Sequence, residues 1–150
     1  MPTSVATIDL EIARQPAAVF DALTRLGALR GRIGASTTYA GTVDVTDDPV
    51  RVGSTYVDRT PIGRLRGQVL ELEPDRRVVF RQALPTGTLD VRITYELERM
   101  PAGTHLVRTG EITTRRWLAL VHPLVVRATH AENRRTMAAM KASLEADPRL

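Results

Sequence analysis

Histidine is the side chain best suited to proton transfer near neutral pH, and this chain has three of them. His122 lies in the apolar stretch 117–126, WLALVHPLVV, beside Pro123. It is either a cavity histidine that donates a hydrogen bond or shuttles a proton, or a histidine at a helix surface or interface. His130 would lie about 80° further round a helix, so the two rings are poorly aligned for a shared metal ion. We therefore predict no metal site.

Acid–base chemistry would require further polar groups near such a histidine. Asp58, Arg59 and Glu111 lie near positions expected to face inward, although Asp58 and Glu111 could equally face solvent. Tyr56 and Tyr95 lie among apolar strand positions, so each hydroxyl needs either a ligand or a protein partner. The sequence has no cysteine, serine triad, phosphate-binding glycine loop or dinucleotide fingerprint. We therefore predict no cofactor and assign no catalytic residue.

A long C-terminal helix is expected to position several of these side chains. Residues 117–144 have the pattern of one helix, which is apolar nearly all round at its start and one-sided at its end. The residues expected to lie near a ligand in its first half are Trp117, Leu118, Val121, His122 and Val125. Trp117, the only tryptophan, would either close a pocket or cap the edge of the core. Pro123 either bends this helix or marks its true start.

The chain before this helix has the pattern of strands. The predicted strands are 5–12, 39–46, 54–60, 65–73, 77–84, 89–98 and 104–113. Two short helices follow the first strand, one starting at Pro16 and one, or a turn, punctuated by Gly27 and Gly31. The alternation slips between Val69 and Leu70, which indicates a bulge or a bend. Closely spaced turns favour antiparallel pairing, so the predicted fold class is α+β.

The composition excludes several classes of protein. A chain of 150 residues is expected to form a single domain, residues 1–150. The net charge is +4 and Lys141 is the only lysine, but the arginines alternate with Asp and Glu along the chain. That pattern favours a solvated sheet face over a nucleic-acid site. The sequence lacks a signal peptide and an apolar stretch long enough to span a membrane, so we predict a cytoplasmic protein without a membrane span.

Four segments, in order along the chain, resemble a known superfamily. Residues 14–23, RQPAAVFDAL, are similar to its P-x-x-V-[FW]-x-x-L helix start, and residues 52–56, VGSTY, to its V-G-x-x-[YF] strand start. Residues 67–78, GQVLELEPDRRV, resemble its G-x-V-x-E-x-E-P-x-x-R-[LV] hairpin, and residues 103–107, GTHLV, its turn into the last strand. The chain thus resembles the SRPBCC superfamily of START and Bet v 1-like helix-grip proteins, and within it the bacterial polyketide cyclase/dehydrase-like group.

This resemblance implies a curved antiparallel sheet of about seven strands wrapped around the long C-terminal helix, with a cavity between them. Members bind lipids, sterols, polyketides or other apolar molecules; some are aromatase/cyclases, and one branch activates Hsp90. We therefore expect a small hydrophobic ligand in the cavity, with a polyketide cyclase/dehydratase activity and a protein-interaction module as alternatives. The residues expected to contact the ligand are Tyr56, Tyr95, Glu111, Trp117, Leu118, Val121, His122 and Val125. The sequence leaves both a monomer and a homodimer open.

Overall fold

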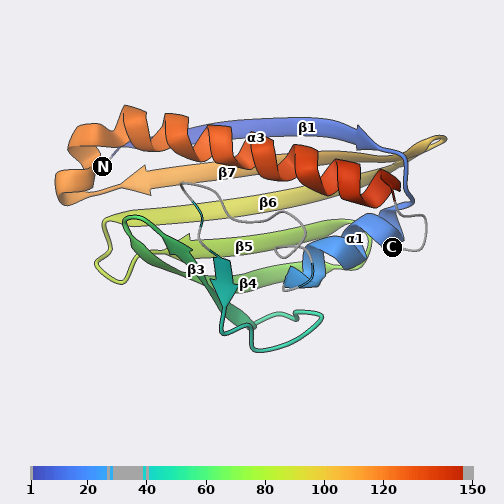
Figure 1. The fold of residues 1–150 in the computed structure, drawn as a ribbon, viewed down its shortest axis with the longest axis horizontal. Helices are drawn as coiled ribbons and strands as arrows, with labels where there is room; N and C mark the ends of the chain where they lie inside the picture. The colour runs from blue at the N-terminus through green and yellow to red at the C-terminus, as the bar shows by residue number, and fades with distance from the viewer. Residues whose placement is uncertain (1, 27, 29–38, 40, 147–150) are drawn as a thin grey trace.

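A seven-stranded antiparallel sheet and a long helix form the two layers of the fold (Figure 1). The computed structural model describes residues 2–26, 28, 39 and 41–146. The elements are β1 (Thr3–Ile12), α1 (Pro16–Thr24), β2 (Gly41–Val43), β3 (Thr55–Thr60), β4 (Gly63–Glu73), β5 (Arg77–Ala83), β6 (Leu89–Met100), β7 (Gly103–Thr114), the 3-10 helix η1 (Arg116–Val121) and α3 (His122–Ala146). The strand order is β1-β7-β6-β5-β4-β3-β2.

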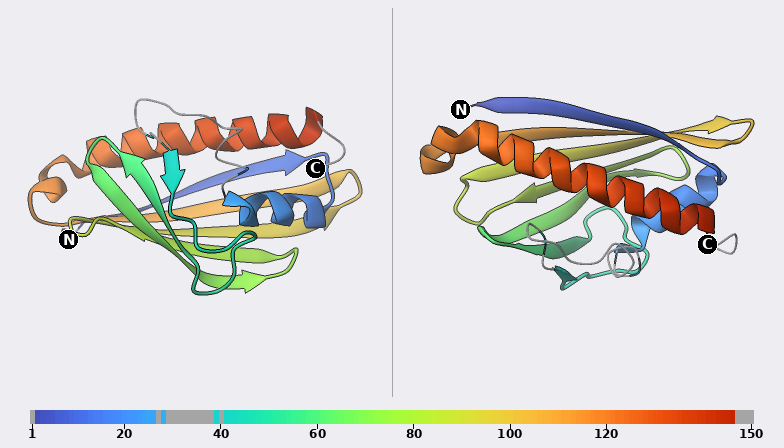
Figure 2. Two further views of the ribbon diagram at one scale, coloured as in Figure 1. Left: turned by 60° about the horizontal axis from the view of Figure 1, so that its bottom comes forward. Right: turned by 45° about the horizontal axis from the view of Figure 1, so that its top comes forward.

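The sheet is strongly curved, and α3 lies along its concave face. Figure 2 shows β3 and β2 curling round towards the side of the sheet that α3 covers, while β1 and β7 run beside the helix. The pairing of β4 with β5 shifts register between Val69 and Glu71, which confirms the predicted bulge. The α+β helix-grip architecture expected from the sequence is therefore confirmed.

Alternating burial along the strands follows the alternation of apolar residues in the sequence. On β6 the apolar side chains are buried on the concave face, while neighbours such as Arg92 and Glu96 are exposed on the convex face. Met137, Met140 and Leu144 of α3 are buried against the same core. Their spacing of three and then four residues places them on one face of the helix. The second half of α3 therefore holds the helix on the sheet.

Two predicted elements differ from those in the structure. The predicted strand 39–46 is reduced to the three residues of β2, because the backbone at Asp44 has a φ of +55° and leaves the extended region. The second short helix after the first strand was expected on a segment most of which lies outside the described residues.

The start of the long helix resolves the alternatives for Pro123. The chain first forms η1 and then begins α3 at His122, so Pro123 lies in the first turn of α3. A proline is tolerated there, because the first amide groups of a helix have no partner within the helix. Among the described residues, no helix combines the length and apolar character that a membrane span requires.

Candidate ligand cavity

A cavity of about 420 Å³ lies between the concave face of the sheet and α3. Side chains from β3 to β7, α1, η1 and α3 form its walls, and most of them are aliphatic or aromatic. This volume and composition are typical of small-molecule sites, which are apolar with a few polar groups. The cavity is therefore the candidate functional site.

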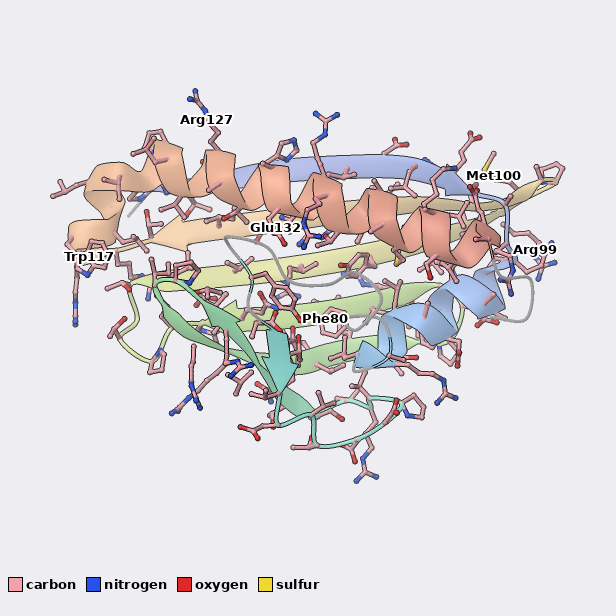
Figure 3. The ribbon with its side chains drawn as sticks, viewed as in Figure 1. Phe80, Arg99, Met100, Trp117, Arg127 and Glu132 are labelled. Carbon is pink, nitrogen blue, oxygen red and sulfur yellow. The ribbon has the colours of Figure 1, made fainter. Side chains whose placement is uncertain are left out.

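A row of aromatic rings forms the floor of the cavity. Phe80 of β5 contacts Tyr56 of β3 and Tyr95 of β6 edge to face, and both pairs of ring centroids are 6.0 Å apart. All three rings are buried, and Figure 3 shows Phe80 near the middle of the sheet. The curved sheet thus presents a continuous aromatic surface to anything that occupies the cavity.

β4 lies between the strands that carry Tyr56 and Phe80. It contributes no side chain beside Tyr56, because the residue there is Gly67. Gly67 of β4 pairs directly with Tyr56 of β3 on one side and with Gln82 of β5 on the other. A Cβ atom at Gly67 would lie 2.1 Å from Cζ of Tyr56, so the tyrosine ring lies directly over the glycine. Glycine at this position lets the ring cross β4 and reach β5.

A buried polar cluster forms at the end of the aromatic row that lies on β3. Gln82 donates one hydrogen bond to the hydroxyl of Tyr56, at 2.8 Å, and another to Oδ2 of Asp58, at 2.9 Å. Thr42 donates to Oδ1 of Asp58 at 2.6 Å. The Thr42 hydroxyl has one proton, so Tyr39 must donate to it across their 2.5 Å contact. Both carboxylate oxygens of Asp58 therefore accept hydrogen bonds.

Arg108 lies at the other end of the row, on β7. Its side chain is only 5% exposed and lines the cavity. Nε donates a hydrogen bond of 3.3 Å to the hydroxyl of Tyr95, and Cζ lies 5.7 Å from the centroid of the same ring. The cavity thus contains a buried cation beside a phenol, four strands away from the buried carboxylate of Asp58.

A third charged side chain of the cavity comes from the helix. Glu132 of α3 points towards the sheet in Figure 3 and lines the cavity. Arg135, one turn further on, donates to both of its carboxylate oxygens, at 2.7 and 3.2 Å. These hydrogen bonds raise the pKa of Arg135 above its ordinary value. The charge of Glu132 is therefore compensated from its own helix.

Exposed apolar side chains surround the mouth of the cavity. Trp117 and Leu124, at the start of the helical segment, are 59% and 63% exposed, and Ile62 in the β3–β4 turn is 47% exposed. All three line the cavity, and Figure 3 shows Trp117 at the end of the molecule where β7 leads into η1. The start of the helical segment is apolar nearly all round because some of its residues, such as Trp117 and Leu124, line the mouth, while Leu118 is buried in the core.

Six of the eight residues predicted to contact a ligand line this one cavity. They are Tyr56, Tyr95, Trp117, Leu118, Val121 and Val125. The other two, His122 and Glu111, lie outside it, contrary to expectation. Glu111 is exposed on the convex face, because the alternation along β7 places it opposite to the buried Ile112. Arg59, a further polar candidate, is likewise exposed and does not line the cavity.

His122 has a different environment from the one expected of a cavity histidine. Its side chain is buried, with Nε2 2.7 Å from the hydroxyl of Ser4 and Nδ1 2.7 Å from the hydroxyl of Thr114. These contacts join β1, the end of β7 and the first residue of α3. The imidazole therefore fixes the position of the helix start on the sheet, as in the interface alternative.

Sequence reasoning missed Gln82, Arg108 and Glu132 as cavity residues. Arg108 shares a strand face with Leu106 and Ile112, so the alternation that identified the strand also places the arginine inside. Charged residues in a strand are normally expected on the solvent face, so the position of Arg108 on the buried face was overlooked. Within the described part of the chain, no three histidine or acidic side chains are grouped as metal ligands.

Comparison with known proteins places this geometry in a family. The solved structure of an uncharacterised protein from Rhizobium leguminosarum is similar over 97% of each chain, with a TM-score of 0.76 and 18% identity. Ara h 8.0201 is similar over 97% of this chain and all of its own, with a TM-score of 0.69 and 12% identity. The di-domain ARO/CYC StfQ from the steffimycin biosynthetic pathway is similar over 93% of this chain and 50% of its own, with a TM-score of 0.72 and 16% identity.

At these identities the structural similarities show the fold alone. A search of curated proteins found no match to this chain. The family model described as polyketide cyclase / dehydrase and lipid transport, in contrast, matches residues 2–145. The sequence resemblance to the SRPBCC superfamily is thereby confirmed. The chain belongs to the polyketide cyclase / dehydrase and lipid transport family.

Proposed function

We propose that this protein binds a small hydrophobic ligand, such as a lipid, a sterol or a polyketide, in the cavity between the sheet and α3. The observation that carries the proposal is the cavity itself, whose aromatic floor and aliphatic walls offer an apolar ligand a large contact surface. Burial of apolar surface supplies about 25 cal/mol per Å², so even a ligand of modest size gains substantial affinity. Family membership supports the same class of function.

The apolar mouth also supports ligand entry. Exposed residues such as Trp117, Leu124 and Ile62 line the opening rather than lying scattered over the surface. Grouped exposed apolar side chains of this kind mark ligand-binding grooves or interaction sites. An apolar molecule arriving from water would contact these side chains first and then the aromatic floor.

A neutral fluorescent probe, N-phenylnaphthylamine, tests this proposal without regard to charged groups. We expect saturable fluorescence enhancement with one probe per chain. Ala128→Phe, at a lining position of α3, should weaken binding at least tenfold by obstructing the cavity. Ala131→Phe, the same change at an exposed position of the same helix outside the lining, is the matched control and should leave the affinity within about twofold. Equal effects of the two variants, or no saturable binding, would contradict the proposal.

A polyketide cyclase or dehydratase activity is the second candidate function. Such chemistry needs ionisable side chains that converge on a substrate, and the cavity provides Arg108 and Tyr95 at 3.3 Å, with Asp58 further along the sheet. A cavity with aliphatic and phenylalanine side chains alone would offer no such pair. Incubation with a poly-β-ketone substrate, followed by mass spectrometry, should reveal loss of water or ring closure. Unchanged product formation in Asp58→Asn and Tyr95→Phe would show that these groups take no part.

A further inference from the structure

We propose that the ligand is an apolar monocarboxylic acid whose carboxylate is bound by Arg108 and by the hydroxyl of Tyr95. This inference rests on the proposed function and adds to it the chemical class of the ligand. Its basis is the buried positive charge of Arg108, which has no negatively charged partner among the described residues.

Arg108 is unusual among the arginines of this chain. Most of the described arginines, such as Arg127 in Figure 3, are exposed, whereas Arg108 is 5% exposed on the concave face. Its partner within the described residues is the hydroxyl of Tyr95, and no carboxylate of that part of the chain lies within 4.0 Å of its guanidinium. A buried guanidinium without an anion is strongly unfavourable, so the cavity is built to receive one.

The carboxylates nearest to the cavity have other partners. Asp58 accepts hydrogen bonds from Gln82 and Thr42, and Glu132 is held by Arg135. Asp58 also lies on β3, four strands from β7, which corresponds to about 19 Å along the sheet at the usual strand spacing. The segment 27–40, most of which lies outside the described residues, contains no Asp or Glu. Neither the described residues nor the segment 27–40 offers Arg108 a carboxylate, so the compensating charge within the cavity is assigned to a ligand.

The terminal nitrogens of the Arg108 guanidinium, Nη1 and Nη2, are accessible to a ligand. Nε is used by Tyr95, while the terminal nitrogens have no partner among the described residues and are not sealed off from the cavity. A Cβ at Gly110 would lie 3.3 Å from Nη1, so the glycine leaves room for the guanidinium along the strand. Nη1 and Nη2 can each donate to one oxygen of a carboxylate, which is the pairing that arginine favours.

Tyr95 supplies a further donor beside this pair. Its hydroxyl accepts the hydrogen bond from Nε of Arg108, and its own proton has no acceptor among the described residues. That proton can be donated to a carboxylate oxygen bound next to Nη1 or Nη2. The Phe80 ring packs against Tyr95 and so holds the phenol in this orientation.

The charge balance favours a monoanion over a phosphate. One carboxylate neutralises Arg108, which is the one buried arginine of the described residues and has no anionic partner among them. The apolar remainder of the ligand then covers the aromatic row. A phosphate dianion would add a second negative charge to a cavity that already contains the buried carboxylate of Asp58. The predicted ligand is thus an acid with a single ionised head group and an apolar body.

Three probes with the same chain and different head groups test the inference: decanoate, decanol and decylamine, titrated calorimetrically below their aggregation concentrations at neutral pH. We expect decanoate to bind the wild-type protein about ten to a hundredfold more tightly than decanol, because its hydrogen bonds to Arg108 are charge-assisted. Arg108→Gln should remove this preference and leave the affinity for decanol within about twofold. Arg92→Gln, which removes an arginine from the convex face, is the matched control and should keep the preference.

The outcomes separate the inference from the proposed function. Equal affinities of the wild-type protein for decanoate and decanol would overturn the inference and leave apolar ligand binding intact. A preference for decylamine, or a decanoate preference that survives in Arg108→Gln, would overturn it as well. Failure of all three probes to bind, together with failure of the neutral fluorescent probe, would overturn the proposed function and this inference with it.

Discussion

The substitution Gly67→Ala tests the packing of the cavity floor most sharply. The new Cβ would lie 2.1 Å from Cζ of Tyr56 and 2.4 Å from both Cε atoms, whereas carbon atoms in contact are about 3.5–4.0 Å apart. The ring must therefore move by about 1.5 Å, away from β4 and into the cavity. This movement would break the 2.8 Å hydrogen bond from Gln82 and disturb the contact with Phe80.

The cost of this movement can be built from its parts. The hydrogen bond contributes about 1 kcal/mol, the aromatic pair about 0.5–1.5 kcal/mol and the strain of overpacking about 1–3 kcal/mol. Alanine is intrinsically more favourable than glycine within a strand, and this preference offsets the loss of stability by about 0.5–1 kcal/mol. We expect a net loss of about 1.5–5 kcal/mol in the free energy of unfolding, measured by urea denaturation. The neutral fluorescent probe should also bind less tightly, since the displaced ring occupies part of the cavity.

The same substitution in a Tyr56→Leu background is the control. Leucine lacks the Cζ and Cε atoms that a Cβ at Gly67 would meet, so Gly67→Ala should there be neutral or stabilising by up to about 1 kcal/mol. A double-mutant cycle therefore isolates the contact between the two positions. The reasoning is refuted if Gly67→Ala costs less than about 0.5 kcal/mol in the wild-type background, or costs the same in both.

Three further predictions concern contacts outside the cavity. His122→Leu should cost about 1–3 kcal/mol of stability, because it leaves the buried hydroxyl of Thr114 and the half-buried hydroxyl of Ser4 without their partner, but should not change probe affinity. The hydrogen bond that His105 donates to Asp9 raises the pKa of the histidine above its ordinary value of 6.5, so Asp9→Asn should lower that pKa in an NMR titration. The hydrogen bond from the amide of Ala13 lowers the pKa of Glu145, so Glu145→Gln should destabilise the protein at neutral pH.

The signs of the two pH dependences differ. The folded-state pKa of His105 is raised, so the stability gained from Asp9 is complete below about pH 6.5 and is lost as the pH rises through the raised value. The folded-state pKa of Glu145 is depressed, so its contribution is present above its ordinary value of 4.5 and is lost as the pH falls through the lowered one. Stability differences that do not change with pH in these directions would contradict both assignments. A loss of probe binding in stably folded His122→Leu would contradict the structural role of that histidine.

Much of the fold could be predicted because its signals are local. Alternating apolar residues identified the strands, and the slip of that alternation at Val69 identified the bulge. The early end of β2 could not be predicted, since the positive φ of Asp44 is a property of the folded backbone that the strand pattern does not reveal. The start of α3 stayed open for a similar reason, because Pro123 fits both a bend and a first turn.

The candidate site was predicted less completely, because it depends on contacts between distant parts of the chain. The apolar lining residues follow from their place on strand and helix faces, and most of them were found. Gly67 has a role only because the register places it beneath Tyr56. Arg108 and Gln82 are polar residues on buried faces, and their partners become known only when β3, β5, β6 and β7 are assembled into one sheet.

A crystal structure of the protein with N-phenylnaphthylamine tests the central claim most directly. Ligand density is predicted in the cavity, with the probe lying over the aromatic row of Tyr56, Phe80 and Tyr95 and beneath α3. Density for the probe at another surface, with the space beneath α3 filled by the protein's own side chains, would contradict the claim that this cavity is the binding site.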